Sequence, residues 1–373
     1  MATAAEIKQA KQRWAIRQQE ISSFGSVSVS DSKQQQAERI ARAREDYAFF
    51  VSYYFPHYTM DKQTGKSIPS APFHIAAANY IRSHHTTRAV FEWARGHAKS
   101  THMGVFIPMW LMAQEKPDIH MVVLVSKSEQ SAIDLIADLQ AELQYNERYA
   151  HDFGKQYNAG QWEAGRFTTL GTKVSFVALG RGQSPRGLKK TGCRPDYIII
   201  DDLDDDELCL NEDRVRRATA WVEDALFPTQ GAEGGRFIMV GNLISKNSVL
   251  YNISQKDGTH LTRVDIRNAQ GRPSWPVDGG THTRTRTVYG LSCLSKRVYE
   301  QPDNRRHRVF GNELGQDTSV ASFQMACVLR RPIAQQQQKQ GKLDEGGLCC
   351  RHARGLLLCD RRTRGQSHQC RIC

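Results

Sequence analysis

The chain has 373 residues, of which 39% are hydrophobic, and its formal net charge is +12 at pH 7. This length can hold two or three domains with cores of their own. No run of about 18 or more apolar residues occurs, and the N-terminus has no apolar signal segment. The sequence therefore predicts no membrane-spanning helix. It predicts a cytoplasmic protein with no membrane partner.

The positive charge is unevenly distributed along the chain. Residues 277–373 contain 17 Lys and Arg against 8 Asp and Glu, whereas residues 1–276 contain 34 against 31. Seven of the nine cysteines also follow residue 276. The net charge is therefore no strong indication that the first three quarters of the chain bind nucleic acid. With two cysteines, that part is typical of an intracellular protein that keeps its thiols reduced.

The first 45 residues are predicted to be N-terminal helices and a linker. Residues 4–20 have helical character, and the Ser- and Gly-rich residues 22–32 are typical of a flexible linker. A second helix is expected from about Gln34 through an aromatic run that ends before Pro56. The domain boundary is placed between residues 45 and 46, where this aromatic run approaches the core.

Residues 71–83 are predicted to form a helix with a proline in its first turn. Phe73 and His74 stand near its start, just before the next predicted strand. They are candidates to flank a purine ring, and the competing interpretation is a packing Phe beside a surface His.

Residues 88–114 carry the layout of a phosphate-binding loop. A buried strand (89–93) leads into a tight loop (94–98), and a helix begins at Lys99. The N-terminus of a helix offers unpaired N–H groups and the positive end of its dipole to phosphate oxygens. Lys99 can reach the β- and γ-phosphates of ATP, and the Ser100 hydroxyl can bind Mg²⁺. The candidate nucleotide-binding residues here are Arg95, Gly96, His97, Ala98, Lys99, Ser100 and Thr101.

The loop departs from the usual motif, because its two glycine positions hold Trp93 and Ala98. A closer literal match surrounds Gly65 and Lys66. No strand precedes that match, and Pro69 follows it closely, which disfavours a helix there. The structural context therefore favours Lys99.

Further along, strands and helices alternate. A β-branched run (119–126) predicts a buried parallel strand, and residues 128–143 predict an amphipathic helix capped by Ser126 or Ser128. The segments RFTTL and TKVSFVALG are predicted to pair as strands. The Arg- and Gly-rich loop 180–190 either contacts phosphates or is a solvated loop.

A second polar site follows the apolar strand 197–200. Asp201 and Asp202 stand at its carboxyl end, where ligands of open α/β sheets bind. One carboxylate can hold Mg²⁺ and the other can orient the attacking water. The acidic run after them is expected to be a solvated turn. A helix (211–228) and a buried strand (234–245) come next, and Asn242 lies near that strand's tip, where it either senses the γ-phosphate or simply turns the chain.

Together the segments WARGHAKST, VVLVSKS, GQSPRGLK, YIIIDDLDDDE and IMVGN resemble, in this order, the ATPase domain of phage terminase large subunits, the DNA-packaging motors. The similarity spans roughly residues 45–275. It implies a P-loop NTPase fold of the RecA/ASCE-like class in residues 46–276, with ATP and Mg²⁺ as cofactors. The family is known for a deviant phosphate loop without the usual glycines, as found here.

The resemblance also implies roles for individual residues. Lys99 and Ser100 would hold the phosphates and Mg²⁺, and Asp201 would be the metal carboxylate. Arg95 would touch the γ-phosphate. Asp202 stands where the family has a catalytic glutamate, and its shorter side chain puts that role in question. Asn242 would couple hydrolysis to movement.

The resemblance further implies partners and a host. These are double-stranded DNA, further copies of the chain in a ring, a small terminase subunit and a portal protein, in a bacterial host cell. Two other interpretations remain open: a helicase-like P-loop ATPase, and a truncated remnant that does not catalyse.

Residues 277–373 depart from the family. A nuclease domain of RNase H type is usual there, yet no Asp-bearing strand pattern occurs, so nuclease activity is not supported. The abrupt change in composition predicts an irregular, basic, Cys-rich tail that is either disordered or produced by a shift of reading frame. A zinc site is a weaker interpretation, because the spacings fit no finger pattern. Its ligands would be Cys349, Cys350, His352, Cys359, Cys370 and Cys373.

Overall fold

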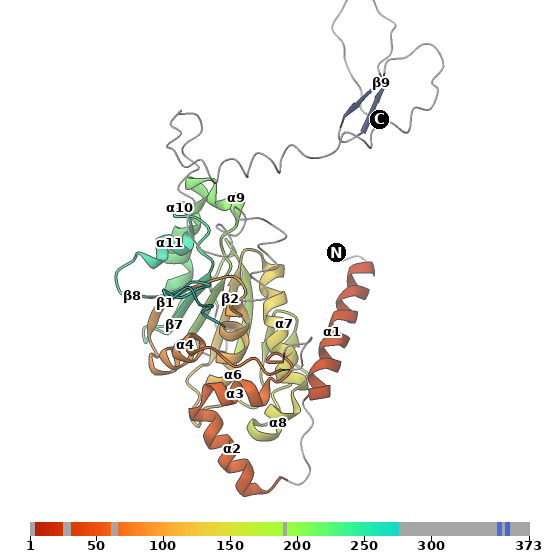
Figure 1. The fold of residues 1–373 in the computed structure, drawn as a ribbon, viewed down its shortest axis with the longest axis vertical. Helices are drawn as coiled ribbons and strands as arrows, with labels where there is room; N and C mark the ends of the chain where they lie inside the picture. Colours follow the sequence, from red (N-terminus) through yellow and green to blue (C-terminus); the bar gives the residue numbers. More distant parts are fainter. Residues whose placement is uncertain are drawn as a thin grey trace, which may run out of the picture. The chain divides into compact units, whose positions relative to one another are not determined.

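The structure is a computed structural model that describes residues 4–24, 31–60, 66–188, 192–275, 349–352 and 355–358 (Figure 1). The chain divides into two compact units, residues 1–307 and 308–373. Within the second unit the described part is an antiparallel hairpin of β9 (Cys349–His352) and β10 (Gly355–Leu358).

In the first unit the described strands are β1 (Thr87–Trp93), β2 (Met121–Ser126), β3 (Trp162–Glu163), β4 (Arg166–Thr168), β5 (Ser175–Gly180), β6 (Tyr197–Asp201), β7 (Arg236–Gly241) and β8 (Thr259–Val264). The described α-helices are α1 (Ala4–Phe24), α2 (Lys33–Glu45), α3 (Tyr47–Tyr54), α4 (Pro72–Ser83), α5 (Lys99–Thr101), α6 (Ile107–Met112), α7 (Glu129–Tyr145), α8 (Glu147–Phe153), α9 (Asp206–Cys209), α10 (Glu212–Ala220) and α11 (Val249–Ser254).

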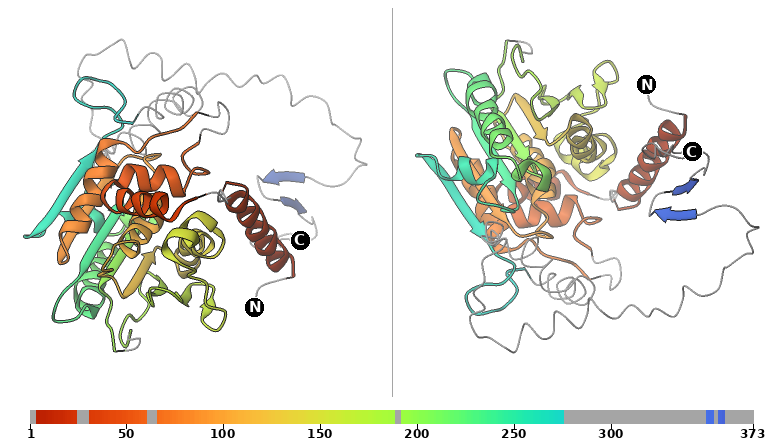
Figure 2. Two further views of the ribbon diagram at one scale, coloured as in Figure 1. Left: turned by 90° about the horizontal axis from the view of Figure 1, so that it is seen from below. Right: turned by 90° about the horizontal axis from the view of Figure 1, so that it is seen from above.

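The strands form one sheet in the order β3-β4-β5-β2-β6-β7-β1-β8. From β5 to β8 all neighbours are parallel, whereas β3 and β4 add an antiparallel edge. Helices lie on both sides of the sheet (Figure 2). The α/β fold expected from the sequence, a mostly parallel sheet flanked by helices, is therefore confirmed.

Both faces of the sheet are buried, which explains the continuous apolar runs of its central strands. Successive side chains of a strand point to opposite faces, and the core is split accordingly. In β6, Tyr197 and Ile199 join one cluster, while Ile198 and Ile200 join the other. The first cluster includes α3, α4 and α7 residues, whereas the second includes α10 and α11 residues.

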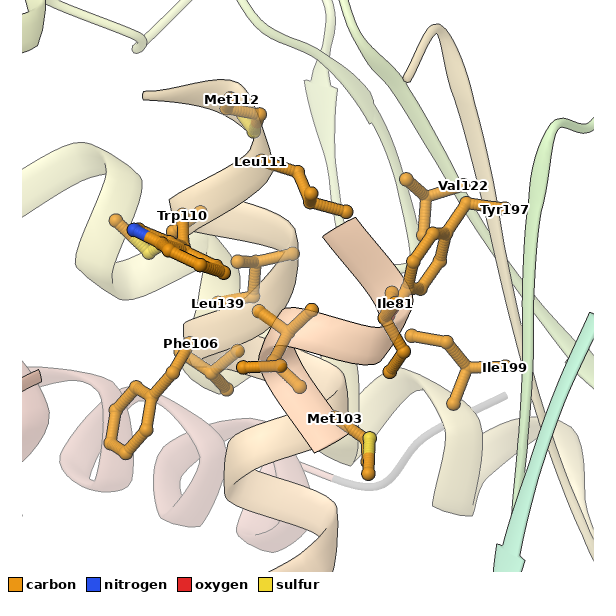
Figure 3. Packing of buried hydrophobic residues seen from close by; sticks show 14 of the residues in the cluster. Ile81, Met103, Phe106, Trp110, Leu111, Met112, Val122, Leu139, Tyr197 and Ile199 are labelled. Carbon is orange, nitrogen blue, oxygen red and sulfur yellow. The ribbon is translucent and has the colours of Figure 1, made fainter. Parts of the chain in front are cut away.

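The segment after the phosphate loop lies deep in the first cluster. Figure 3 shows Met103, Phe106 and Trp110 gathered there with side chains from the neighbouring elements. The helix is α-helical at Lys99–Thr101, has a π-helical stretch at His102–Phe106, and returns to α at Ile107. Pro108 lacks the N–H that an α-helix would use at that position, which accounts for irregularity nearby. The burial of this helix gives the loop a fixed base.

The single helix expected from Gln34 to Pro56 is instead two helices, α2 and α3. Asp46 is extended (φ −103°, ψ 96°) and stands between them. Its backbone N–H donates to the Arg42 carbonyl (2.8 Å), and its Oδ1 accepts from the Phe49 N–H (2.9 Å). A single residue thus ends one helix and caps the next, and this cap was overlooked in the sequence.

Asp46→Ala is expected to lower the free energy of unfolding by about 1 kcal/mol, because α3 loses its N-cap. Urea unfolding followed by circular dichroism measures the change. Glu45→Ala is the matched control, since Glu45 is exposed and its pair with Arg82 (3.4 Å) is expected to contribute under about 1 kcal/mol. Equal losses in the two variants would contradict the cap.

Other expectations can be compared with the described residues. The N-terminal helix extends to Phe24, and residues 25–30 of the expected linker lie outside the described residues. Helix α7 begins after Ser128, which settles the choice of cap: the Ser128 side chain accepts from the Ser131 N–H. The RFTTL and TKVSFVALG strands pair as predicted. None of the described helices has the length and apolar character to cross a bilayer.

Most of the predicted tail lies outside the described residues, including Cys359, Cys370 and Cys373. Cys349, Cys350 and His352 belong to β9. No group of three or more His, Cys, Asp or Glu side chains suited to a metal ion occurs among the residues that the structure describes. The zinc interpretation and the shift of reading frame remain sequence-based hypotheses.

Candidate functional site: a cleft at the carboxyl edge of the sheet

The phosphate loop connects β1 to α5. Gly96 (φ 92°) and Ala98 (φ 49°) both have positive φ, although glycine is absent from the usual motif positions. A non-glycine residue in the left-handed region costs free energy, so surrounding contacts must hold Ala98 in place. The loop therefore achieves its turn with one glycine and one strained alanine, and the helix begins at Lys99.

Three parallel strands end at the same edge of the sheet. Strand β7 lies between β1 and β6 in strand order. Because parallel strands end on one side, the loop after β1, the Asp pair after β6 and Asn242 after β7 lie at one edge. Asp202 has φ 44°, a left-handed conformation that Asp tolerates better than most residues.

The loop and the acidic strand meet directly. The Lys99 Nζ is 3.8 Å from the Asp202 Oδ1. The Ser100 side chain is hydrogen-bonded to Asp201, which is 3% exposed. The Asp201 Oδ1 has no hydrogen-bond partner within the described part of the chain. The two segments, far apart in sequence, thus place a lysine, a hydroxyl and two carboxylates together.

Burial, and after it the nearby Asp202 carboxylate, raise the pKa of Asp201 to about 7. The hydrogen bond from Ser100 and the Lys99 ammonium oppose this rise. A buried carboxylate with a raised pKa and an oxygen without a partner is poorly satisfied by the protein alone. A bound cation would correct both defects.

The site opens into a cavity of about 700 Å³. Six of the predicted site residues line it, namely Arg95, Lys99, Ser100, Asp201, Asp202 and Asn242. Gly96, His97 and Ala98 of the loop and Thr101 of α5 do not line this cavity, and neither do Phe73 and His74. Lys66 of the rival motif is also absent from it, and Gly65 lies outside the described residues.

His74 occupies a different place from the expected one. It is completely buried under the loop, and its Nε2 lies 2.9 Å from the His97 carbonyl oxygen. Phe73 is half-buried and packs against Trp93 and His97. His74 is therefore not a surface histidine, and its complete burial leaves it no exposed face with which to contact a purine.

The acidic run after Asp202 is not a solvated turn, in contrast to the expectation. Asp204 accepts from the Val249 and Leu250 N–H groups (2.8 and 2.9 Å), so it caps α11. Asp205 caps α9 through the Leu208 N–H (2.7 Å). Asp204 and Asp205 therefore form hydrogen bonds within the protein, whereas Asp202 faces Lys99.

The Arg-rich loop is described up to residue 188. Arg181 donates to the Leu203 carbonyl (2.8 Å) and pairs with Asp205 (3.4 Å). It therefore holds the acidic segment against the sheet. A phosphate contact by this loop stays a prediction, and Lys189 and Lys190 lie outside the described residues.

Two cations of the cavity were missed in the sequence. Lys127 follows the end of β2, and Arg17 comes from α1 and pairs with Asp138 of α7. The position of Lys127 directly after a predicted parallel strand was an available signal. Arg17 gave no signal, because only packing places α1 beside α7.

The donor set suits Mg²⁺. Ser100 and Asp201 offer oxygen atoms, which are the ligands that Mg²⁺ prefers. Magnesium in nucleotide sites is held by one or two protein oxygens together with phosphates and water, and no all-protein cage is needed. Lys99 and the start of the helix would face the phosphates. The residues present therefore fit a magnesium–nucleotide complex.

The chain is similar to large terminases of two bacteriophages. The HK97 bacteriophage large terminase has 14% sequence identity and a TM-score of 0.46, over 69% of this chain and 55% of that chain. The large terminase of the thermophilic bacteriophage D6E has 12% identity and a TM-score of 0.38, over 62% and 53%. The chain thus spans about half the length of each. No family model and no curated protein matches it.

Sequence identities of 12–14% do not by themselves show a shared activity. The function of the chain is therefore inferred from the geometry of its own residues.

Asp201→Asn is expected to stabilise the protein at pH 8 in the absence of nucleotide and Mg²⁺. The folded state holds the Asp201 proton more tightly than the unfolded state, so wild-type stability falls as pH rises from about 4 to about 7. The variant lacks this penalty. Urea unfolding at pH 5 and pH 8 is expected to show a gain that is larger at pH 8. A variant less stable than wild type at pH 8 would contradict the claim that burial destabilises the ionised Asp201 carboxylate.

Proposed function

We propose that this chain is the ATPase of a phage DNA-packaging motor, a large terminase subunit that couples ATP hydrolysis to translocation of double-stranded DNA into a procapsid. The observation that supports it most is the meeting of the phosphate loop with the Asp pair: Lys99 lies 3.8 Å from Asp202, and Ser100 is bonded to Asp201. The proposal is limited to ATP hydrolysis and translocation, and does not include a nuclease.

In the proposed site, the protein binds the triphosphate through the loop. The Lys99 ammonium contacts the β- and γ-phosphates, and N–H groups at the start of the helix donate hydrogen bonds to the phosphate oxygens. Arg95 is exposed within the loop and lines the cavity, so its guanidinium can reach the γ-phosphate. Ser100 and Asp201 would hold Mg²⁺, which neutralises charge on the phosphates when bound.

Hydrolysis needs an oriented water molecule. Asp202 is 57% exposed at its side chain and lies beside Lys99, so it can accept a hydrogen bond from a water in the cleft. The water oxygen forms a bond to the γ-phosphorus, and the bond from that phosphorus to the bridging oxygen of ADP breaks. The water proton leaves toward Asp202 or a phosphate oxygen. Positioning and charge stabilisation supply most of the rate.

Movement is proposed to begin at Asn242. It follows β7, whose neighbours are the strands that carry the loop and the Asp pair. The chain then leads to α11, whose first N–H groups are held by Asp204 of the acidic segment. A change at the γ-phosphate can therefore reach α11 from two sides.

The proposed partners are double-stranded DNA, further copies of the chain in a ring, a small terminase subunit and a portal protein. Both similar solved structures are of large terminases, which supports this direction without identifying the surfaces used.

The proposal is tested by measuring ATP turnover of the full chain with and without double-stranded DNA. We expect Mg²⁺-dependent turnover that double-stranded DNA increases. Turnover stimulated only by single strands, with strand separation, would favour a helicase-like ATPase. Absence of both nucleotide binding and turnover would leave a non-catalytic remnant and overturn the proposal.

A further inference from the structure

A group of buried aromatic and imidazole side chains lies under the phosphate loop. His74 of α4 and His102 of the helix after the loop stack with ring centroids 3.8 Å apart and planes 15° apart. The Tyr47 hydroxyl lies 2.7 Å from the His102 Nδ1, and Trp275 packs edge-on against His74 (5.0 Å, 89°). Four segments distant in sequence thus converge on this pair of stacked imidazoles.

The hydrogen bonds of His74 define its tautomer. Its Nδ1 accepts from the Ala71 N–H (3.0 Å) at the start of α4, so Nδ1 carries no proton. A neutral imidazole then carries its proton on Nε2, which donates to the His97 carbonyl (2.9 Å). Burial lowers the pKa of His74 to about 4, which keeps it neutral. The side chain is therefore a fixed bridge from α4 to the loop.

This bridge acts on a particular peptide group. The carbonyl of His97 and the N–H of Ala98 belong to one planar trans peptide and point in opposite directions. When His74 holds the carbonyl from below, the Ala98 N–H points to the other side of the loop. Ala98 is the residue in the left-handed conformation (φ 49°), and it immediately precedes Lys99.

We infer that His74 is a positioning residue that orients the His97–Ala98 peptide so that its N–H faces the phosphates. In a loop without the usual glycines, this hydrogen bond fixes a conformation that the sequence alone does not favour. The inference rests on the proposed function. It assigns to His74 a role in phosphate binding, in place of the purine contact predicted from the sequence. Trp275, which packs against His74, is itself held in place because its Nε1–H donates to the Pro69 carbonyl (3.0 Å).

Two substitutions separate the hydrogen bond from simple packing. The glutamine amide reaches as far as Nε2 and carries an acceptor and a donor, so His74→Gln can keep both bonds. The shorter asparagine reaches only the Nδ1 position, so His74→Asn can keep the bond to Ala71 but loses the one to His97. His84→Leu, on an exposed histidine after the same helix, is the control.

The full chain is titrated with a fluorescent non-hydrolysable ATP analogue and, by competition, with inorganic tripolyphosphate, each with Mg²⁺. We expect His74→Asn to weaken both ligands by about tenfold, the effect of one lost hydrogen bond, and His74→Gln to remain close to wild type. Loss for the ATP analogue alone would indicate a purine contact and overturn the inference. Equal binding by all variants, or equal loss in Asn and Gln, would also overturn it.

A second readout does not depend on binding. Long-range ¹⁵N NMR of the wild-type imidazoles reports which nitrogen of His74 is protonated. The inference requires Nε2, and protonation on Nδ1 would overturn it even if the Asn variant failed to fold. If wild type bound neither ligand, the proposed function would fail, and the NMR result would still decide the state of His74.

Discussion

Lys99→Ala is expected to reduce ATP turnover by at least about 100-fold while the chain stays folded. Lys99 is 8% exposed, lies at the start of the helix and faces Asp202 at 3.8 Å. The other lysine that lines the cavity, Lys127, follows strand β2 and does not belong to the phosphate loop. Turnover is measured by phosphate release at saturating Mg·ATP, and folding by circular dichroism.

Lys66→Ala is the matched control for this variant. Lys66 belongs to the closer literal match to the phosphate-loop motif, but it is exposed and does not line the cavity. We expect its turnover to equal that of wild type. Loss of activity in Lys66→Ala with full activity in Lys99→Ala would transfer the phosphate site to the other loop.

Asp202→Asn is expected to lower kcat by about 100-fold or more and to leave the affinity for Mg·ATP within a few-fold. The carboxylate is proposed to orient the water, a role in the transition state rather than in binding. Single-turnover hydrolysis and equilibrium binding are measured on the same preparation. A variant that hydrolyses ATP normally would remove Asp202 from the reaction.

The neighbouring carboxylate provides the contrast. Asp201→Asn is expected to raise the Mg²⁺ concentration needed for turnover and to weaken nucleotide binding, because Asp201 is proposed to hold the metal. Asp202→Glu tests whether the length of the side chain that carries the carboxylate matters, and we expect this variant to retain turnover. If the Asp201 and Asp202 variants showed the same defects, the separate roles assigned to them would be wrong.

The central strands and their functional tips were predictable from sequence. Strand β6 is a continuous apolar run that ends in Asp201, and a strand buried on both faces leaves this pattern because both sets of side chains must be apolar. The same reasoning located β1 and β7. It placed Lys99 in the loop and helix after one strand and the Asp pair at the end of another, and the order of these strands then brought them together.

Other features could not be read from periodicity. Strand β8 (Thr259–Val264) was missed because it is an edge strand with partly exposed Thr, His and Arg side chains, which resemble a loop. The break at Asp46 was missed because helical patterns continue on both sides of it. The burial of His74 was also hidden, since it depends on a carbonyl that only the folded loop presents to it.

The most direct test of the site is electron paramagnetic resonance of Mn²⁺, used in place of Mg²⁺, with a non-hydrolysable ATP analogue. We predict one bound Mn²⁺ per nucleotide in the wild-type chain, and weaker Mn²⁺ binding in both Ser100→Ala and Asp201→Asn. This result would require the phosphate loop and the acidic strand to share one metal–nucleotide complex. Unchanged Mn²⁺ binding in both variants would contradict it.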